Sequence, residues 1–170
     1  MKKGQATIGH IFIYILAIFI FALILLYGYK AIVQFMEKGE QVSLIQFKTT
    51  LQTNVQDLAI QYGDVIVFNE NNPLKAPSRY KEICFVADDA VEQQLPTDER
   101  YDIMRAAVDA DMHKSTENVF LIPQAEHSIY VGPIELGDYG ELPYLCINFT
   151  KNLLNIRLEG RGDKTRISRI

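Results

Sequence analysis

Cysteine and histidine are scarce in this chain, with two and three residues respectively among 170. So few thiol and imidazole groups exclude a zinc ribbon, an iron–sulfur site and a small domain held together by many disulfides. Basic side chains are also in the minority, because 17 Lys and Arg face 21 Asp and Glu, and the formal net charge is −4. A nucleic-acid-binding domain needs a basic face, so we expect no nucleic-acid partner. The length allows one domain and a short appendage.

Charged side chains are absent from Thr7 to Tyr29, a stretch made almost wholly of large apolar residues. The apolar run Ile8–Tyr29 would span roughly 33 Å as a helix, and the hydrocarbon core of a bilayer is about 30 Å thick. A secretory signal peptide has a shorter apolar region, and a buried core helix rarely stays apolar on every face for this length. Residues 7–29 are therefore predicted to cross the lipid bilayer as a single transmembrane helix.

The charges that flank this segment predict its orientation. Two lysines and the α-amino group lie within the first three positions, whereas Lys30 and Lys38 on the other side are accompanied by Glu37 and Glu40. Lysine and arginine near the ends of a membrane helix favour the cytoplasmic side. We therefore expect a cytoplasmic N-terminus at the cell membrane, with residues 63–170 forming an extracytoplasmic domain.

The first residues of the chain carry a more specific pattern. Met1-Lys-Lys-Gly-Gln-Ala-Thr-Ile-Gly9 places a basic pair, then Gly4 and then Gln5 directly before the apolar segment. This start resembles the class III, or prepilin-type, signal of archaeal type IV pilins and pilin-like proteins. The resemblance implies that a prepilin-type peptidase removes residues 1–4 by cleaving between Gly4 and Gln5, and that the apolar helix stays in the mature protein.

The match to the pilin pattern continues for a few residues and then departs from it. Archaeal pilins often continue with Gln-x-Ser-x-Glu-x-x-x-Leu, and the matching positions here are Gln5, Thr7, Gly9 and Ile13. Thr7 and Ile13 are conservative variants, whereas Gly9 replaces the acidic residue. In the family that glutamate is thought to pair with the amino terminus of a neighbouring subunit. Its absence bears on polymerisation more than on processing.

Two functions are consistent with this organisation. The resemblance implies a non-enzymatic pilin-like structural subunit or minor pilin of an archaeal type IV pilus-like assembly, with copies of itself or other pilins as partners. The alternative is an unprocessed, membrane-anchored ectodomain that binds a ligand or an envelope partner. We expect no enzymatic activity and no cofactor, because the sequence has no Gly-x-Ser-x-Gly motif, no His-Glu-x-x-His motif and no phosphate-binding loop.

A second helical pattern follows the transmembrane segment, in residues 30–62. Apolar residues recur there at intervals of three and four, the period of one helix face: Leu44, Phe47, Leu51, Val55, Leu58 and Tyr62. No proline precedes Pro73, so the two segments are predicted to form one long helix. The apolar stripe can pack on a sheet of its own chain or form a short parallel coiled coil.

The pattern changes after Gly63 to short runs rich in β-branched residues, separated by turn-forming residues. The expected strands are Val65–Asn69, Glu82–Ala87, Asn118–Pro123, Ile129–Ile134, Tyr144–Asn148, Leu153–Glu159 and Thr165–Ile170. Short connections predict that the last three of these strands form an antiparallel meander. The tripeptide Arg161-Gly-Asp163 is interpreted as a hairpin turn rather than as an adhesion motif.

One further helix is expected to interrupt the strands, with Thr97 as its N-cap and Asp98 and Glu99 at the positive end of its dipole. Its predicted buried stripe is Tyr101, Met104, Val108 and Met112. The fold class is therefore α+β, with a long N-terminal transmembrane-to-amphipathic helix packed on a mostly antiparallel sheet and one short helix in addition. This layout is similar to the head of a type IV pilin.

Cys84 and Cys146 each lie inside an apolar predicted strand. In an extracytoplasmic domain two cysteines more often pair than stay free, so they are a candidate disulfide. The alternative is two small buried apolar residues on unrelated strands. An EF-hand loop beginning at Asp109 fails, because Lys114 stands in place of the glycine and Phe120 in place of the bidentate glutamate, so no metal is expected.

Charge is distributed unevenly along the chain. Residues 1–63 carry five basic and three acidic side chains, residues 64–150 six and sixteen, and residues 151–170 six and two, which gives +2, −10 and +4 and adds to −4. The basic C-terminal segment can be neutralised inside one domain, or it can face the acidic surface of the next subunit in a head-to-tail contact. The candidate assembly residues are Arg161, Lys164, Arg166 and Arg169.

Overall fold

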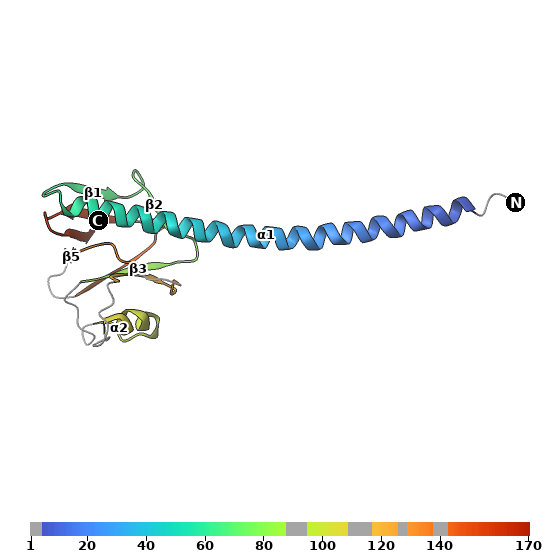
Figure 1. The fold of residues 1–170 in the computed structure, drawn as a ribbon. Helices are drawn as coiled ribbons and strands as arrows, with labels where there is room; N and C mark the ends of the chain where they lie inside the picture. The colour runs from blue at the N-terminus through green and yellow to red at the C-terminus, as the bar shows by residue number, and fades with distance from the viewer. Residues whose placement is uncertain (1–4, 88–94, 109–116, 126–128, 138–142) are drawn as a thin grey trace. The chain divides into compact units, whose positions relative to one another are not determined.

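The computed structural model of the protein, drawn in Figure 1, describes residues 5–87, 95–108, 117–125, 129–137 and 143–170. The chain divides into two compact units, Met1–Gln41 and Val42–Ile170. The first unit contains the N-terminal part of helix α1. The second contains the rest of α1 and all of the described strands.

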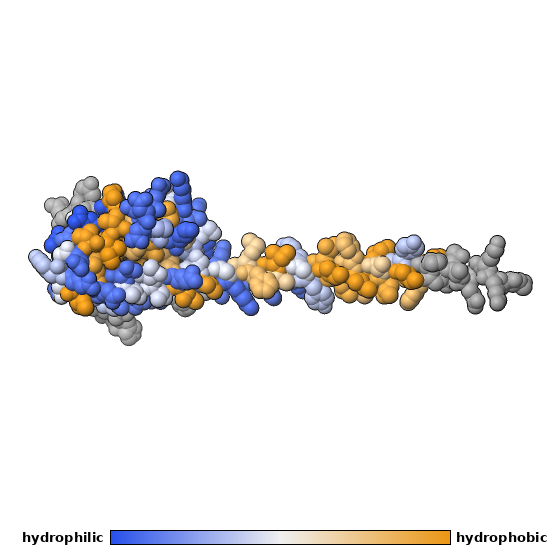
Figure 2. All heavy atoms as spheres, turned by 90° about the horizontal axis from the view of Figure 1, so that it is seen from above, coloured by the Kyte–Doolittle hydropathy of each residue, from blue (hydrophilic) through white to orange (hydrophobic). Residues whose placement is uncertain are grey.

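Helix α1 comprises Gln5–Ala59, 55 residues in one element. The two predicted helical segments are therefore parts of one helix, as the lack of proline indicated. In the first unit the large apolar side chains from Ile11 to Leu26 are exposed, and Figure 2 shows many of them in orange. Among the described residues, α1 is the one helix long and apolar enough to cross a membrane, which is compatible with a single-pass membrane protein.

The last part of α1 supplies one wall of the core in the second unit. Four residues of the predicted stripe are at most 3% exposed and lie in the main apolar cluster: Phe47, Leu51, Val55 and Leu58. The stripe therefore packs on the sheets of its own chain. Tyr62 does not join it and is 79% exposed. The helix ends at Ala59, and Gly63 follows with a φ of +85°, a left-handed conformation that favours glycine.

Nine strands among the described residues make up three sheets. They are β1 Val65–Phe68, β2 Leu74–Lys75, β3 Glu82–Val86, β4 Val119–Ile122, β5 Ile134–Leu136, β6 Tyr144–Asn148, β7 Leu153–Leu154, β8 Ile156–Gly160 and β9 Thr165–Arg169. The sheet orders are β1-β8-β9-β5, β4-β3-β6 and β2-β7. Every pairing is antiparallel except β5 with β9, so the predicted α+β class with mostly antiparallel strands is confirmed.

The short helix occurs where it was predicted, but its cap differs. A 3-10 turn, η2, comprises Glu99–Tyr101 and leads into α2, Asp102–Val108. The N-cap is Asp98 rather than Thr97, because the Asp98 carboxylate accepts a hydrogen bond of 3.1 Å from the Arg100 N–H.

The predicted stripe of this helix faces a second apolar cluster. Tyr101 and Met104 are buried in it, and Val108 is partly buried against it. Met112 lies outside the described residues. The described part of the stripe thus packs inward, as the sequence predicted.

The four-stranded sheet β1-β8-β9-β5 buries one face only. Along β8, Ile156 and Leu158 are fully buried, whereas Arg157 is exposed and Glu159 is half-buried. In β9, Ile167 is buried in the same way. This alternation is typical of a strand with one face on the core and the other in solvent. The inner face belongs to the same apolar cluster as the end of α1.

The three-stranded sheet β4-β3-β6 is covered on both faces. Ile83 and Phe85 of β3 belong to the main cluster with α1, whereas Cys84 and Val86 belong to the second cluster with α2. Within the second unit of Figure 1, β3 accordingly lies between the end of α1 and α2. A strand that is buried on both faces has a nearly continuous apolar sequence, as Glu82–Val86 has after its first residue.

The prediction that the last three expected strands form a meander is wrong. β6 pairs with β3, whereas β8 pairs with β9 and β1. The strand expected over residues 153–159 divides, and its first part, β7, pairs with β2. The physical reason lies in β6, because Leu145 and Ile147 face the main cluster while Tyr144 and Cys146 face the second. A strand with apolar side chains on both faces fits the three-stranded sheet, which is covered on both sides, better than the four-stranded sheet, which has one face in solvent.

The prediction of a strand over residues 129–134 is also wrong. Ile129 makes a single bridge to β4, and the strand β5 begins only at the end of this range. The buried Asn118 side chain holds the segment instead. Its Nδ2 donates to the Gly132 carbonyl at 2.7 Å, and its Oδ1 accepts from the Val131 N–H at 3.1 Å. One amide side chain thus takes the place of a neighbouring strand.

Candidate functional site

The predicted cleavage position lies at the very start of the described chain. Gln5 is the first residue of α1, and Gly4 lies outside the described residues. Cleavage between the two therefore stays a prediction. The helix extends as far as the residue that cleavage would make the new amino terminus.

Cys84 and Cys146 form the predicted disulfide. They are register partners on β3 and β6, and their Cα atoms are 4.0 Å apart. The Phe149 N–H donates to the Lys81 carbonyl at 2.8 Å, which makes that pair a hydrogen-bonded one. Counting along the ladder, 84 and 146 form a non-hydrogen-bonded pair, where side chains of adjacent strands approach most closely. The strand register therefore explains how residues separated by 62 positions are bridged.

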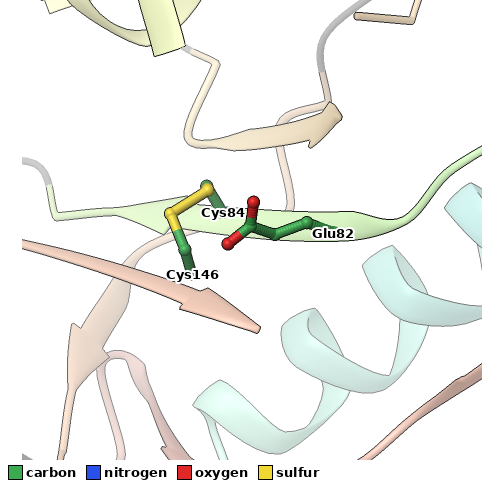
Figure 3. Close-up of side chains that lie close together, drawn as sticks. All are labelled: Glu82, Cys84 and Cys146. Atoms are coloured by element: carbon green, nitrogen blue, oxygen red, sulfur yellow. A yellow bond between two sulfur atoms is a disulfide. The ribbon is translucent and has the colours of Figure 1, made fainter. Parts of the chain in front are cut away.

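A buried carboxylate faces this disulfide. Glu82 precedes Cys84 by two positions on β3, so both side chains lie on the same face of the sheet. Glu82 is 8% exposed, and Figure 3 shows its carboxylate directed toward the sulfur atoms. A carboxylate oxygen and the two sulfurs all lie within 4.8 Å of one another. Burial of a carboxylate costs free energy unless it has a partner, so this placement calls for a physical account.

The partner on the other side of Glu82 is Tyr101, which comes from η2. The Tyr101 hydroxyl donates to Glu82, with 3.2 Å to Oε2. Burial raises the pKa of the Tyr101 hydroxyl, and the nearby Glu82 carboxylate raises it further. The Arg100 Cζ atom lies 4.7 Å from the centre of the Tyr101 ring. Its positive charge lowers the pKa of the hydroxyl, but by less than burial and Glu82 raise it. The hydroxyl therefore stays protonated at neutral pH and stays a donor to the carboxylate.

Two of the candidate assembly residues share one carboxylate on the outer face of the four-stranded sheet. Arg166 Nε lies 3.0 Å from Glu135 Oε1, and Lys164 Nζ lies 3.4 Å from Glu135 Oε2. The hydrogen bond from Arg166 lowers the pKa of the Glu135 carboxyl, although burial opposes this shift, and Lys164 adds a smaller effect in the same direction. Both cations thus have a partner within their own domain.

The other two candidates also have contacts inside the domain. Arg161 Nη1 lies 3.2 Å from Glu159 Oε1, and Arg157 lies 3.7 Å from the other oxygen of the same carboxylate. Arg169 Nη2 donates to the Cys146 carbonyl at 2.8 Å. These contacts correspond to neutralisation within one domain, one of the two alternatives for the basic segment. We call the outer side chains of Arg157, Arg161, Lys164 and Arg166 the basic face; they outnumber Glu135 and Glu159.

The tripeptide Arg161-Gly-Asp163 lies between β8 and β9. The Arg161 N–H donates to the Lys164 carbonyl at 2.9 Å, and Gly162 has a φ of +93°. The interpretation as a hairpin turn is confirmed, since a left-handed glycine is what such a turn requires.

The acidic residues between positions 64 and 150 contribute no further group of ligands in the described part of the chain. Glu82, Cys84 and Cys146 are the one group there of His, Cys, Asp or Glu close enough to hold a metal ion. Phe120, which fills the glutamate position of the rejected EF-hand, is a core residue of β4. Asp109 and Lys114 lie outside the described residues.

Sequence reasoning missed Glu82 and Gly160, and neither carries a local signal. A single glutamate at the start of an apolar strand usually faces solvent, whereas this one is buried and accepts a hydrogen bond from Tyr101 of η2. Gly160 lies where β8 meets the end of α1. A Cβ atom there would lie 1.9 Å from the Gln61 carbonyl oxygen and 2.3 Å from the Leu58 carbonyl oxygen. Only the assembled core shows that this position has no room for a side chain.

Comparisons of the chain with protein-family models, with curated proteins and with solved structures gave no match.

Proposed function

We propose that this protein is a pilin-like subunit, a non-enzymatic single-pass membrane protein that a prepilin-type peptidase processes between Gly4 and Gln5. The observation that carries the proposal is the continuity of α1 from Gln5 to Ala59. One helix includes Gln5, the residue that cleavage would expose, contains the apolar segment and ends inside the core of the α+β domain. A single element can thus anchor the subunit before assembly and connect its domain to a filament afterwards.

The exposed side chains of the first unit support this role. Ile11, Phe12 and Tyr14 are each more than half exposed, and the same holds for most large apolar residues that follow. Exposing apolar surface to water costs a free energy of about 25 cal/mol per Å². Side chains exposed over this length therefore need lipid or other apolar helices as surroundings. Both environments are those of a pilin-like subunit, first in the cell membrane and then in an assembly with copies of itself or other pilins.

In this proposal the domain forms the surface of the subunit and catalyses no reaction. The N-terminus would be cytoplasmic and the α+β domain extracytoplasmic, where a disulfide such as Cys84–Cys146 is stable. Contacts of the candidate assembly residues with acidic segments of a neighbouring copy would guide the register, while the apolar helices supply most of the affinity. These residues are Arg161, Lys164, Arg166 and Arg169.

Processing gives the direct test. The wild-type protein, isolated from native membranes, is expected to begin at Gln5, whereas Gly4→Val should accumulate with its original terminus. Gly28→Val is the matched control, because a side chain added at Gly28 meets no atom within 4 Å, and it should be processed like the wild type. An intact Met1 terminus on the wild-type protein in processing-competent cells would refute the proposal and leave the unprocessed, membrane-anchored ectodomain.

A further inference from the structure

The buried group of Glu82, Cys84 and Cys146 is not explained by the proposed pilin role. A disulfide alone would pin β3 to β6, and an apolar residue at position 82 would pack beside it without the cost of a buried carboxylate. We propose that reduction of the disulfide converts these three side chains into a binding site for a thiophilic divalent cation of the zinc class.

The ligand atoms already lie within range of a common ion. One carboxylate oxygen and the two sulfurs are within 4.8 Å of one another. Tetrahedral zinc has bonds of about 2.3 Å to sulfur and about 2.1 Å to oxygen, which places two sulfur ligands about 3.8 Å apart. Once the bond between them is broken, the sulfurs need only move apart by rotation of their side chains. The pairing of β3 with β6 holds the backbones in register throughout, because five residue pairs join these strands.

The electrostatics of the site favour a cation only in the reduced state. The disulfide is neutral, so in the oxidised protein the sulfur atoms offer no thiolate to a cation. Reduction produces two thiols next to the Glu82 carboxylate. A divalent cation would take both sulfurs, as thiolates, and the carboxylate oxygen as ligands, a set that the neutral disulfide does not supply. Cys84 is fully buried, and the apolar cluster around it keeps the interaction strong.

The conversion balances in electrons and protons. A dithiol reductant gives up two electrons and two protons and becomes a disulfide, while Cys84 and Cys146 become thiols. Binding of the cation then releases the two thiol protons to solvent, and both sulfurs bind as thiolates. Cys146 is only partly buried and belongs to β6, the last strand in the order β4-β3-β6, so it is the more exposed of the two cysteines.

Tyr101 completes the surroundings of the proposed site. Its hydroxyl donates to Glu82 and thereby orients the carboxylate, as the neighbours of metal-binding carboxylates commonly do. The same hydrogen bond would exist if Glu82 served only to hold η2. A purely structural Glu82 would leave cation binding unchanged on substitution, and this difference separates the two roles.

The experiment uses the full chain in detergent micelles and Co²⁺ as a spectroscopic probe for zinc. The protein is reduced with a phosphine, which does not compete as a thiolate ligand. The reduced wild type is expected to bind one Co²⁺ with thiolate-to-cobalt charge-transfer bands, and Zn²⁺ should displace it. The oxidised protein should show no such bands. Glu82→Gln should weaken the affinity at least about tenfold, because one ligand is lost.

Two control variants separate the site from general effects. Glu135→Gln removes another partly buried carboxylate, on β5 of the four-stranded sheet rather than on the sheet of the two cysteines, and should bind Co²⁺ like the wild type. Cys84→Ser should abolish the charge-transfer bands. Circular dichroism shows which samples are folded. If the reduced wild type unfolds without metal, the cation is expected to restore its fold and to fail to restore that of Glu82→Gln at the same concentration.

Two results would overturn the inference. One is a reduced wild-type protein without charge-transfer bands. The other is equal affinity of the wild type and Glu82→Gln, which would show binding by two thiolates without the carboxylate. Neither result bears on processing at Gly4 and Gln5, so the site and the proposed function are tested independently.

Discussion

The Thr165 hydroxyl donates a hydrogen bond of 2.7 Å to the backbone carbonyl of Val55, a residue 110 positions earlier in the chain. Both residues are completely buried. The bond joins the first residue of β9 to α1, on the helix face that packs into the main apolar cluster. It complements the apolar contacts, which have no direction of their own, with one directional contact.

Removal of this hydroxyl should destabilise the domain without changing its shape. Thr165→Val keeps a β-branched side chain of similar volume and removes the only polar group, so we expect a loss of about 1 kcal/mol in the free energy of unfolding. Urea denaturation of the full chain in detergent measures it. Thr150→Val, at an exposed position, is the control and should change the stability by less than about 0.5 kcal/mol. Equal stability of the two variants would contradict the structural role of the bond.

The contact between Gly160 and the end of α1 predicts a larger effect. In Gly160→Ala the new Cβ would lie 1.9 Å from the Gln61 carbonyl oxygen, so backbone must move. We expect a loss of about 1–3 kcal/mol, as for other overpacked positions. Gly39→Ala is the control, because Gly39 has no neighbour within 4 Å, and in a helix this change is neutral or slightly stabilising. A Gly160→Ala variant as stable as wild type would show that β8 and α1 are less closely packed than described.

The ion pair of Arg166 with Glu135 predicts a pH-dependent stability. Arg166 lowers the folded-state pKa of Glu135 below its ordinary 4.5. The contribution of the ion pair to folding stability is therefore present above pH 4.5 and is lost as the pH falls through the folded-state pKa. Arg166→Gln should therefore cost up to about 1 kcal/mol at pH 7, since the pair is partly exposed, and the difference should shrink below about pH 4.5. Urea denaturation at pH 7 and pH 3 measures it. Lys151→Gln, which breaks a fully surface pair with Glu70, should have no such effect. A difference that grows toward acid would contradict the assignment.

The proposed assembly predicts a role for the basic C-terminal segment. A variant with four neutral substitutions should self-associate less at low salt and differ less from the wild type at high salt, because salt screens charge: Arg161→Gln, Lys164→Gln, Arg166→Gln and Arg169→Gln. Neutral glutamine avoids the repulsion that a reversed charge would create next to Glu135. Light scattering of the detergent-solubilised chain measures the association.

The control for this variant removes the same formal charge from another part of the domain, at four exposed residues: Lys75, Arg79, Lys81 and Arg100. If both variants associate alike, net charge rather than the C-terminal segment governs assembly. If neither differs from the wild type, the contacts of these arginines and lysines serve their own domain only.

The long helix could be predicted from the sequence because its signal is local. Charge is absent from Thr7 to Tyr29, and the stripe from Phe47 to Leu58 repeats with the helical period. Each pattern arises from neighbours within a few turns of the same helix. The same is true of most strand positions and of the turn at Gly162, because β-branched runs and turn residues act over short distances.

The pairing of the strands was decided by tertiary structure. β6 does not join the expected meander, because the side chains on its two faces pack into two different apolar clusters. The sequence of one strand does not show which clusters its two faces will contact. Asn118 took the place of a strand partner for residues 131 and 132. In both places the winning interaction joins segments far apart in the chain, so no pattern within either segment contains it.

The chain by itself determined that a long apolar helix leads into an α+β domain and that two cysteines lie on apolar strands. Only the folded domain decided that these cysteines face each other, that Glu82 lies beside them and that Gly160 admits no side chain. Helix and strand propensities follow from the sterics and periodicity of adjacent residues. Which residues lie next to one another in space follows from burying two apolar clusters at once, and that is a property of the whole domain.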